Sequence, residues 1–257
     1  MRLTGFEGKL AIVTGAAGGI GQAVTRALLD AGATVIATDT EAALAANPVA
    51  PGAIAHVLDV RDGPAADALV AWAEAQHGPL ALGIHVAGIV TISPLLDMAL
   101  TEWQRVFDIN TTGTFNVTRA FGVAMARQGA GAIVTVSSNA AGIPRLNMGA
   151  YAASKAAATM LIRCLGLELA AKGVRCNIVA PGSTLTPMQT GMWASDGGAG
   201  ERAVLDGNLE AYRTGIPMKK LATPEDIAGA VMFFLSDQAG HVTMADLYVD
   251  GGATLRA

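Results

Sequence analysis

Short runs of apolar residues alternate with longer runs of helical periodicity over almost the whole chain. The short runs are apolar at consecutive positions, which is typical of strands buried on both faces of a sheet. They are Leu10–Val13, Thr34–Thr38, Ile54–Leu58, Leu82–Val86, Ala132–Val136, Arg175–Val179 and Asp246–Val249. The helical runs between them are Ile20–Asp30, Ala65–Gln76, Glu102–Arg127, Ala150–Ala171 and Glu225–Leu235. This alternation predicts the α/β class, with a doubly wound, mostly parallel, seven-stranded sheet and helices on both faces.

One stretch interrupts the alternation. Residues 183–220 are rich in glycine and only weakly periodic, whereas no linker, internal repeat or low-complexity block divides the rest of the chain. In a compact domain, a long irregular segment is more often functional than a boundary. We therefore expect residues 1–257 to form a single dinucleotide-binding catalytic domain, in which residues 183–220 are a substrate lid.

The composition indicates a well-buried core and argues against polyanionic partners. Hydrophobic residues make up 52% of the chain and charged residues 15%, which excludes intrinsic disorder. The 17 basic and 21 acidic residues give a net charge of −4, so neither nucleic acid nor an anionic membrane surface is expected to bind. The long uncharged runs contain proline, glycine and hydroxyl or amide residues, so none is predicted to span a membrane.

The cysteines and the N-terminal pattern indicate a cytoplasmic protein. Cys164 falls in a helical run and Cys176 in a strand-like run, so both are expected to be buried free thiols in a reducing compartment. The first apolar run, Leu10–Val13, is too short for the core of a signal peptide.

A glycine-rich turn connects the first predicted strand to the first predicted helix. Glycine lets the backbone approach a ligand where a Cβ would collide, and a helix N-terminus offers free N–H groups to a pyrophosphate. The alternative is an ordinary tight turn. However, the strand before it, the helix after it and an acidic residue at the end of the second strand match a Rossmann-type dinucleotide fingerprint. The expected contacts are Gly15, Gly19, Ile20 and Gly21.

Asp39 is that acidic residue, 18 positions beyond Gly21. A carboxylate there can accept hydrogen bonds from both ribose hydroxyls and repels a 2′-phosphate, and its neighbours supply no cation, which favours NAD over NADP. The alternative is a capping aspartate. Asp59 and Val60 follow the third strand at the same sheet edge, where they are candidates to border the adenine. A turn role for Asp59 is equally plausible.

Three residues after the fifth strand suggest redox chemistry. Ser138 follows that strand, and Tyr151 and Lys155 are four positions apart on one face of the next helix. A phenol is a poor base, but a nearby ammonium and a bound nicotinamide cation would lower its pKa. Each residue alone is commonplace.

Asn110, in the long helical run, would kink the helix and hold a relay water near Lys155, although a mid-helix asparagine often bonds only the local backbone.

Together with Pro181-Gly182, these motifs resemble the short-chain dehydrogenase/reductase superfamily over nearly the whole chain. The resemblance implies a hydride-transferring oxidoreductase with a catalytic tetrad. It also implies that the turn after the fourth strand and the end of the sixth strand line the cofactor. The implied tetrad is Asn110, Ser138, Tyr151 and Lys155, and the further implied cofactor contacts are Ala87, Gly88, Pro181, Gly182, Thr184 and Thr186.

One departure from the superfamily pattern falls at His85. The superfamily usually has Asn-Asn-Ala-Gly where this chain has His85-Val86-Ala87-Gly88, which puts some hydrogen bonds of that turn in doubt. We expect His85 to be a hydrogen-bonded turn residue rather than a catalytic base.

A closer resemblance is to the 2,3-dihydro-2,3-dihydroxybenzoate dehydrogenases of catecholate siderophore biosynthesis. It rests on short stretches, the most specific of which lie in residues 183–220. The stretches are Gly131–Ser138, Pro144-Arg145, Met148, Gly166–Ala170, Gly173–Asn177, Pro181–Thr184, Met188-Gln189, Trp193, Ser195-Asp196, Gly215–Pro217 and Val249–Gly252. The resemblance implies NAD-dependent oxidation of a carboxylated cyclohexadiene diol, followed by aromatisation, with no metal. It also implies a homotetramer, and the run Ala152–Ala171, which carries only three charges, is apolar enough to require a further partner surface.

An acidic substrate requires a cation in the pocket. Arg145 lies between Ser138 and Tyr151, and a guanidinium suits a planar carboxylate, so Arg145 is the candidate; a solvated loop arginine is the alternative. Residues that could cover the ring, or simply pack, are Met148, Met188, Met192 and Trp193.

Two other functions remain open at this point. A 3-oxoacyl-carrier-protein reductase or an alcohol dehydrogenase would keep the tetrad but change the substrate. A non-catalytic NAD sensor would keep the nucleotide site alone, although the intact Ser138, Tyr151 and Lys155 argue against it.

Overall fold

The computed structural model describes residues 2–191, 193 and 199–255, and these contain one sheet of seven parallel strands. The strands are β1 (Leu10–Thr14), β2 (Thr34–Asp39), β3 (Ile54–Val57), β4 (Leu80–His85), β5 (Gly131–Val136), β6 (Val174–Pro181) and β7 (Asp246–Val249). Their order is β3-β2-β1-β4-β5-β6-β7, so it reverses between β1 and β4, where a ligand site is expected at the carboxyl ends. The predicted doubly wound fold is confirmed, and the sheet is wholly parallel.

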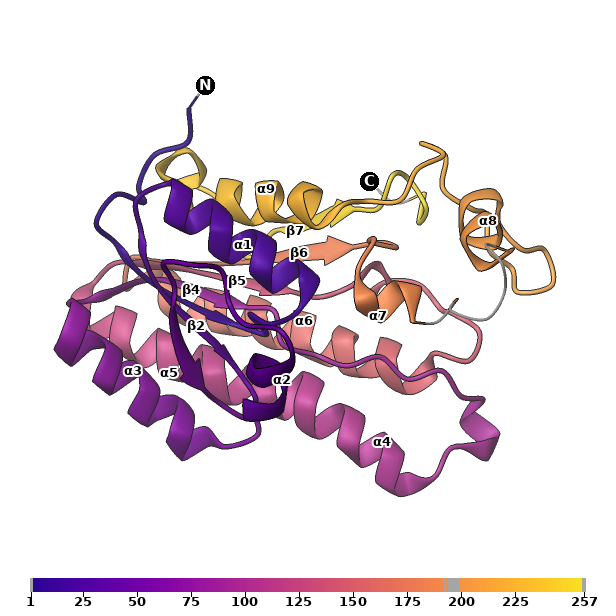
Figure 1. Ribbon diagram of the computed structural model, residues 1–257, viewed down its shortest axis with the longest axis horizontal. Helices are drawn as coiled ribbons and strands as arrows, with labels where there is room; N and C mark the ends of the chain where they lie inside the picture. The colour runs from indigo at the N-terminus through magenta and orange to yellow at the C-terminus, as the bar shows by residue number, and fades with distance from the viewer. Residues whose placement is uncertain (1, 192, 194–198, 256–257) are drawn as a thin grey trace.

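Helices cover both faces of this sheet (Figure 1). On one face, α1 (Gly19–Asp30) and α9 (Pro224–Leu235) form a buried apolar cluster with the strands. On the other face, α3 (Gly63–His77), α5 (Gly113–Gln128) and α6 (Gly149–Ala170) form a second buried cluster. The shorter elements are α2 (Glu41–Ala46), α4 (Leu100–Phe107), α7 (Pro187–Thr190), α8 (Ala199–Asp206), η1 (Leu95–Asp97), η2 (Asp108–Thr112), η3 (Asn139–Ala141) and η4 (Asp237–Ala239). Among the described residues, no helix combines the length and apolar character that a membrane crossing requires.

Local capping explains where several helices begin and end. At α9, the Thr223 side chain accepts from the Asp226 amide and the Asp226 side chain accepts from the Thr223 amide, which forms a capping box. At α3, the Asp62 side chain accepts from the Ala65 amide. Gly129 closes α5 with φ of 74°, in the left-handed region.

The predicted continuous helix over Glu102–Arg127 is wrong at its centre. Asp108–Thr112 form a π-helical turn, η2, between α4 and α5. The Thr114 hydroxyl donates to the Asn110 carbonyl at 2.6 Å, and the Asn110 side chain bonds to residues outside the helix. Side chains that compete for backbone groups and neighbouring elements favour such a widened turn.

Cys164 is exposed, so the prediction of two buried thiols is correct for Cys176 alone. The positions of α6 that face the interior include Ile162, Gly166 and Leu169. Cys164 lies two residues after Ile162, and at 3.6 residues per turn this places it on the opposite side of the helix. The exposed side of α6 also carries Leu167.

Candidate active site

The glycine-rich turn packs its backbone tightly against the turn that follows β4. Gly15 has φ of +67°, and a Cβ there would lie 2.6 Å from the Ala87 amide nitrogen. A Cβ on Gly21 would lie 2.7 Å from the Gly15 carbonyl carbon, and one on Gly19 would lie 3.0 Å from Thr186 Cγ2. The structure thus brings together the glycine turn, the β4 turn and the start of residues 183–220. The Gly18 backbone caps α1, whose N-terminus is open to a pyrophosphate.

Asp39 holds its carboxylate above the glycine turn at the end of β2. Its Oδ2 accepts from the Ala17 amide at 3.1 Å, and its Oδ1 accepts from the Thr40 amide at 2.8 Å. These two amides fix the carboxylate and leave it further lone pairs for ribose hydroxyls. The expected position of Asp39 beside the nucleotide turn therefore fits a dinucleotide.

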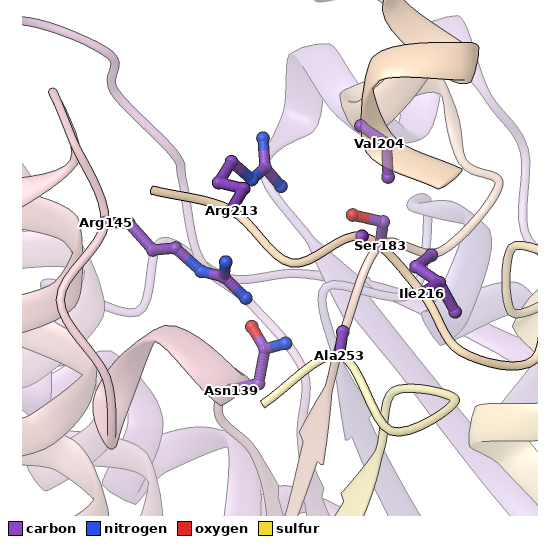
Figure 2. Close-up of a pocket in the computed structure, with 8 residues that line it drawn as sticks. Asn139, Arg145, Ser183, Val204, Arg213, Ile216 and Ala253 are labelled. Atoms are coloured by element: carbon purple, nitrogen blue, oxygen red, sulfur yellow. The ribbon is translucent and has the colours of Figure 1, made fainter. Parts of the chain in front are cut away.

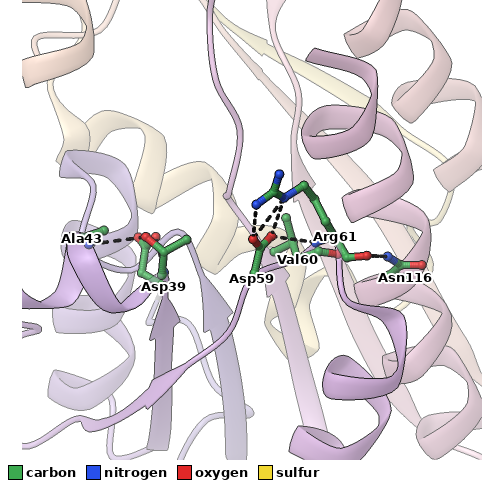
Figure 3. A network of polar contacts seen from close by, with 7 residues as sticks. Asp39, Ala43, Asp59, Val60, Arg61 and Asn116 are labelled. Carbon is green, nitrogen blue, oxygen red and sulfur yellow. Dashed lines mark hydrogen bonds and ion pairs between the residues drawn. The ribbon is translucent and has the colours of Figure 1, made fainter. Parts of the chain in front are cut away.

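Asp59 is engaged by Arg61, which the sequence analysis did not consider (Figure 3). The Arg61 guanidinium donates to Asp59 through Nε at 3.0 Å and Nη2 at 2.5 Å, and the hydrogen bonds to Arg61 lower the pKa of Asp59. Asn116 Nδ2 donates to the carbonyls of Val60 and Arg61 at 3.0 Å each. Asp59 and Val60 thus stand in a braced turn, and contact with an adenine stays a prediction. The spacing of Asp59 and Arg61, two positions apart, could have indicated this ion pair from the sequence.

Ser138, Tyr151 and Lys155 converge at the carboxyl end of β5. Ser138 Oγ accepts from the Ala140 amide at 3.1 Å, and the Tyr151 and Ser138 side chains are hydrogen-bonded to each other. Lys155 Nζ donates to the Val136 carbonyl at 3.1 Å. The predicted juxtaposition of hydroxyl, phenol and ammonium is therefore present.

Burial shifts the pKa of two of these groups. It raises the pKa of Tyr151, while the hydrogen bond from Ser138 acts in the opposite direction. Burial also lowers the pKa of Lys155 to about 8. The sequence analysis expected the tyrosine pKa to fall through the ammonium and a bound cofactor. In this structure desolvation outweighs the other effects, because a phenolate loses its hydration when it is buried.

Asn110 joins the β4 turn to α6. Its Oδ1 accepts from the Ile89 amide at 2.8 Å, and its Nδ2 donates to the Ile89 carbonyl at 2.9 Å and to Ser154 Oγ at 3.0 Å. A Cβ on Gly88 would lie 3.1 Å from Asn110 Oδ1 and 3.0 Å from Lys155 Nζ. The expected kink is present as the π-helical turn, whereas the relay water stays a prediction.

His85 differs from the expected hydrogen-bonded turn residue, because it ends β4 and is only half paired. Its Nδ1 lies 2.9 Å from Thr14 Oγ1, and its buried Nε2 has no hydrogen-bond partner within the described part of the chain. Burial, and secondarily the charge of Lys155, lowers the pKa of His85 to about 3. The imidazole is thus held neutral, which makes it a poor general base.

The end of β6 is tied to the loop that follows β7. A Cβ on Gly182 would lie 2.9 Å from Asp250 Cα, so the two backbones touch. The Asp250 carboxylate accepts from the Gly252 and Thr254 amides at 2.9 and 3.1 Å and from Asn139 Nδ2 at 3.3 Å. Asp250 therefore links the residue after Ser138 to the turn after β7.

Pro181, Thr184 and Thr186 follow the same edge. Pro181 ends β6, the Thr184 hydroxyl donates to the Gly182 carbonyl at 3.2 Å, and the Thr186 side chain caps α7. Thr186 lies beside Gly19 of the glycine turn, and contact of the three residues with the cofactor stays a prediction.

A pocket lined in part by Asn139, the residue after Ser138, contains two arginines (Figure 2). Arg145 projects into it from the loop between η3 and α6, and Arg213 enters from residues 183–220. Burial, then the charge of Arg213, lowers the pKa of Arg145, and Asp250 opposes this. The pocket is lined by Asn139, Arg145, Ser183, Val204, Arg213, Gly215, Ile216 and Ala253. Arg145 is thus a half-buried pocket residue. The sequence analysis did not propose Arg213, for which the only available indication was an arginine within the glycine-rich stretch.

The predicted ring-covering residues are not among those that line this pocket. Met148 precedes α6, Met188 lies half-exposed in α7, and the Trp193 amide donates to the Thr190 carbonyl at 3.0 Å. Met192 lies outside the described residues, as do Ser195 and Asp196. Substrate contact by these side chains stays a prediction.

Comparison with known proteins supports an enzyme assignment. A family profile described as enoyl-(acyl carrier protein) reductase matches residues 15–254. The chain is 49% identical to 2,3-dihydro-2,3-dihydroxybenzoate dehydrogenase of Bacillus subtilis strain 168, with 99% of each chain covered. It is 41% identical to the Escherichia coli K12 dehydrogenase of the same name, over 98% of this chain and 99% of that one. The ligand-free aldohexose dehydrogenase of Thermoplasma acidophilum superposes with a TM-score of 0.88 at 29% identity, over 100% and 98% of the two chains.

The chain belongs to the short-chain dehydrogenase/reductase family. It is an oxidoreductase of that family, whose dehydrogenases use a nicotinamide cofactor and act on small molecules. The predicted family, fold and enzyme class are confirmed, whereas the roles of individual side chains stay predictions.

Proposed function

We propose that this enzyme oxidises 2,3-dihydro-2,3-dihydroxybenzoate to 2,3-dihydroxybenzoate with NAD, in siderophore biosynthesis. The observation that carries the proposal is the half-buried Arg145 beside Asn139, one residue from Ser138. A guanidinium there suits the carboxylate of a substrate whose ring hydroxyl meets Ser138 and Tyr151. The identity of the dehydrogenases from B. subtilis and E. coli supports the same substrate.

The protein's own groups handle the proton of the reacting hydroxyl. When bound, an oxidised nicotinamide supplies the hydride acceptor. Ser138 donates a hydrogen bond to the substrate oxygen and fixes its position. Burial raises the pKa of Tyr151 in the cofactor-free protein, but the charges of Lys155 and of a bound oxidised nicotinamide would favour the phenolate. The phenolate would take the hydroxyl proton as the carbon gives up its hydride. The product ketone then tautomerises to the catechol, and the gain of aromaticity makes the oxidation favourable.

Asn110 positions Lys155 for this chemistry. Its amide bonds Ile89 on one side and Ser154 on the other, so it holds Lys155 in register with the turn after β4. The neutral His85 beneath that turn adds no competing positive charge near Lys155.

NAD rather than NADP is the proposed cofactor. The Asp39 carboxylate stands at the end of β2, braced by two amides, where it can accept from the ribose hydroxyls and repel a 2′-phosphate. Arg61, a cation at the next strand end, is paired with Asp59 and so is not free to neutralise a phosphate.

The direct test is incubation of the enzyme with the dihydrodiol acid and NAD. We expect NADH absorbance and catechol absorbance to rise together, with one NADH formed per catechol. Good turnover of an aliphatic alcohol or a 3-oxoacyl substrate with no turnover of the acid would replace the proposal by another activity of the family.

Tyr151→Phe separates an enzyme from an NAD sensor. The variant keeps the ring and loses the hydroxyl, so we expect a rate loss of about 10²-fold or more with unchanged NAD binding by calorimetry. Full activity in this variant would assign the proton transfer to another group.

We also propose a cytoplasmic homotetramer. Support comes from the free Cys164 and Cys176, which suit a reducing compartment, and from the exposed apolar side chains of α5 and α6. These side chains are Phe115, Val123, Met160 and Leu167. Light scattering during gel filtration tests the mass.

A further inference from the structure

Arg213 is carried by a closed hairpin within residues 183–220. The backbones of Asn208 and Arg213 exchange two hydrogen bonds of 2.9 Å each. Gly207 and Gly215 flank them with φ of +91° and +79°, and a Cβ on Gly207 would lie 2.8 Å from the Gly215 nitrogen. Only glycine permits this close approach at positive φ, so the hairpin holds Arg213 in one place.

Directly beyond Arg213, the hairpin is tied to the loop that follows β7 and to α8 of the same segment. The Thr214 hydroxyl donates to the Ala253 carbonyl at 3.2 Å. Ile216 donates its amide to the Leu205 carbonyl at 3.0 Å, and its side chain is buried at 4% exposure. Arg213 is therefore part of the pocket wall, although it comes from the proposed lid.

Arg145 and Arg213 line the same pocket, in which the Arg145 guanidinium lies nearer to Asn139 (Figure 2). Within the described residues, neither guanidinium has a salt bridge or a hydrogen bond to the protein. Other half-buried arginines differ, because Arg163 pairs with Asp246 and Arg175 donates to backbone carbonyls.

Two like charges in a partly desolvated pocket destabilise the empty site. Burial lowers the pKa of Arg213, and Arg145 experiences the same effect with the charge of Arg213 in addition. The negative charge of Asp250 raises the pKa of Arg145. The Asp250 carboxylate also accepts hydrogen bonds from two backbone amides and from Asn139. Asp250 thus supplies one negative charge beside two guanidinium groups, and an anionic ligand would balance the remaining positive charge.

We propose that Arg213 is a second specificity residue, which binds the substrate carboxylate together with Arg145 in the pocket that both side chains line. The inference rests on the proposed function. A carboxylate offers about four acceptor sites, enough for two guanidinium groups. Because Arg213 belongs to the hairpin of residues 207–215, this hairpin supplies one wall of the proposed acid site.

The test compares Arg213→Gln with Arg202→Gln. Arg202 is exposed on α8 in the same segment and does not line the pocket, so its variant controls for loss of charge in the lid. The substrates are the dihydrodiol acid and its neutral primary amide. We expect Arg213→Gln to lower kcat/KM for the acid about 10- to 100-fold, mainly through KM, and to leave the amide nearly unchanged. Arg202→Gln stays within about twofold for both.

A binding measurement separates this inference from the proposed function. Calorimetry with 2,3-dihydroxybenzoate and NADH should give weaker product binding for Arg213→Gln and partial recovery for Arg213→Lys, which keeps the charge without the fork. If the wild type binds the product and turns over the acid, but Arg213→Gln matches Arg202→Gln, the role of Arg213 is overturned. If the wild type itself neither binds the product nor oxidises the acid, the proposed function fails. An equal loss of acid and amide turnover in Arg213→Gln would indicate a fold defect rather than lost carboxylate binding, and it would contradict the inference.

Discussion

Replacement of Lys155 by methionine should make the cofactor-free protein more stable and far less active. Lys155 is 6% exposed, and burial lowers its pKa from 10.5 to about 8. At 1.36 kcal/mol per pH unit, a buried ammonium then costs about 3 kcal/mol at pH 7. Loss of the hydrogen bond to the Val136 carbonyl offsets about 1–2 kcal/mol of this. The net expectation is a gain of about 1–2 kcal/mol in the free energy of unfolding at pH 7.

The pH dependence of stability gives the sharper measurement. Between pH 8 and 10.5 the unfolded chain binds more protons at this lysine than the folded protein does, so stability rises with pH. The wild type should therefore gain about 2 kcal/mol between pH 7 and 9.5, relative to Lys155→Met. The advantage of the variant at neutral pH should disappear near pH 9.5.

Urea unfolding of the cofactor-free proteins at fixed protomer concentration measures both effects. Lys172→Met, at an exposed position just beyond α6, is the matched control and should show no such pH-dependent difference. A Lys155→Met variant that is less stable than the wild type by the same amount at both pH values would refute the reasoning, because the ammonium would not then be desolvated.

Two further substitutions test the nucleotide site. Asp39→Ala should weaken NAD binding about 10- to 100-fold and narrow the preference over NADP, measured as the ratio of kcat/KM values; equal wild-type efficiency with both cofactors would contradict the role of Asp39. Gly21→Ala should weaken NADH binding at least about tenfold, because its Cβ would collide with the Gly15 backbone, measured by NADH fluorescence titration. Gly18→Ala is the milder control, because its Cβ would lie 3.3 Å from the Gly15 carbonyl oxygen. Equal NADH dissociation constants for the two variants would show that the turn can rearrange to accommodate a Cβ at Gly21.

Most strands and the main helices were predictable because buried elements show runs or periodic patterns of apolar residues in the local sequence. β1, which is buried at all five positions, ends one residue later than expected, at Thr14, and α9 begins one residue earlier than expected, at Pro224. The short helix α2 was not predicted, because its six residues are all partly or fully exposed and so show no apolar face.

The contacts that build the site were less predictable, because they join residues far apart in the chain. The spacing of Tyr151 and Lys155 showed that they share a helix face, whereas the π-helical turn at Asn110 depends on Ile89 and Ser154. Arg213 reaches the pocket only because a hairpin closes behind it, and no local pattern encodes that approach. The exposed Cys164 shows the same limit, since a helix with so few charged residues does not reveal which side will be covered.

The carboxylate of Asp250 connects the turn near the C-terminus to the arginine pocket, where we propose that the substrate carboxylate binds. It ties the turn that ends at Ala253, a wall of the arginine pocket, to Asn139, 111 positions away. A substitution in that turn would therefore shift which acids the enzyme accepts before it weakened the sheet. Variants with altered ring preference should be sought among residues 250–254 as readily as beside Tyr151.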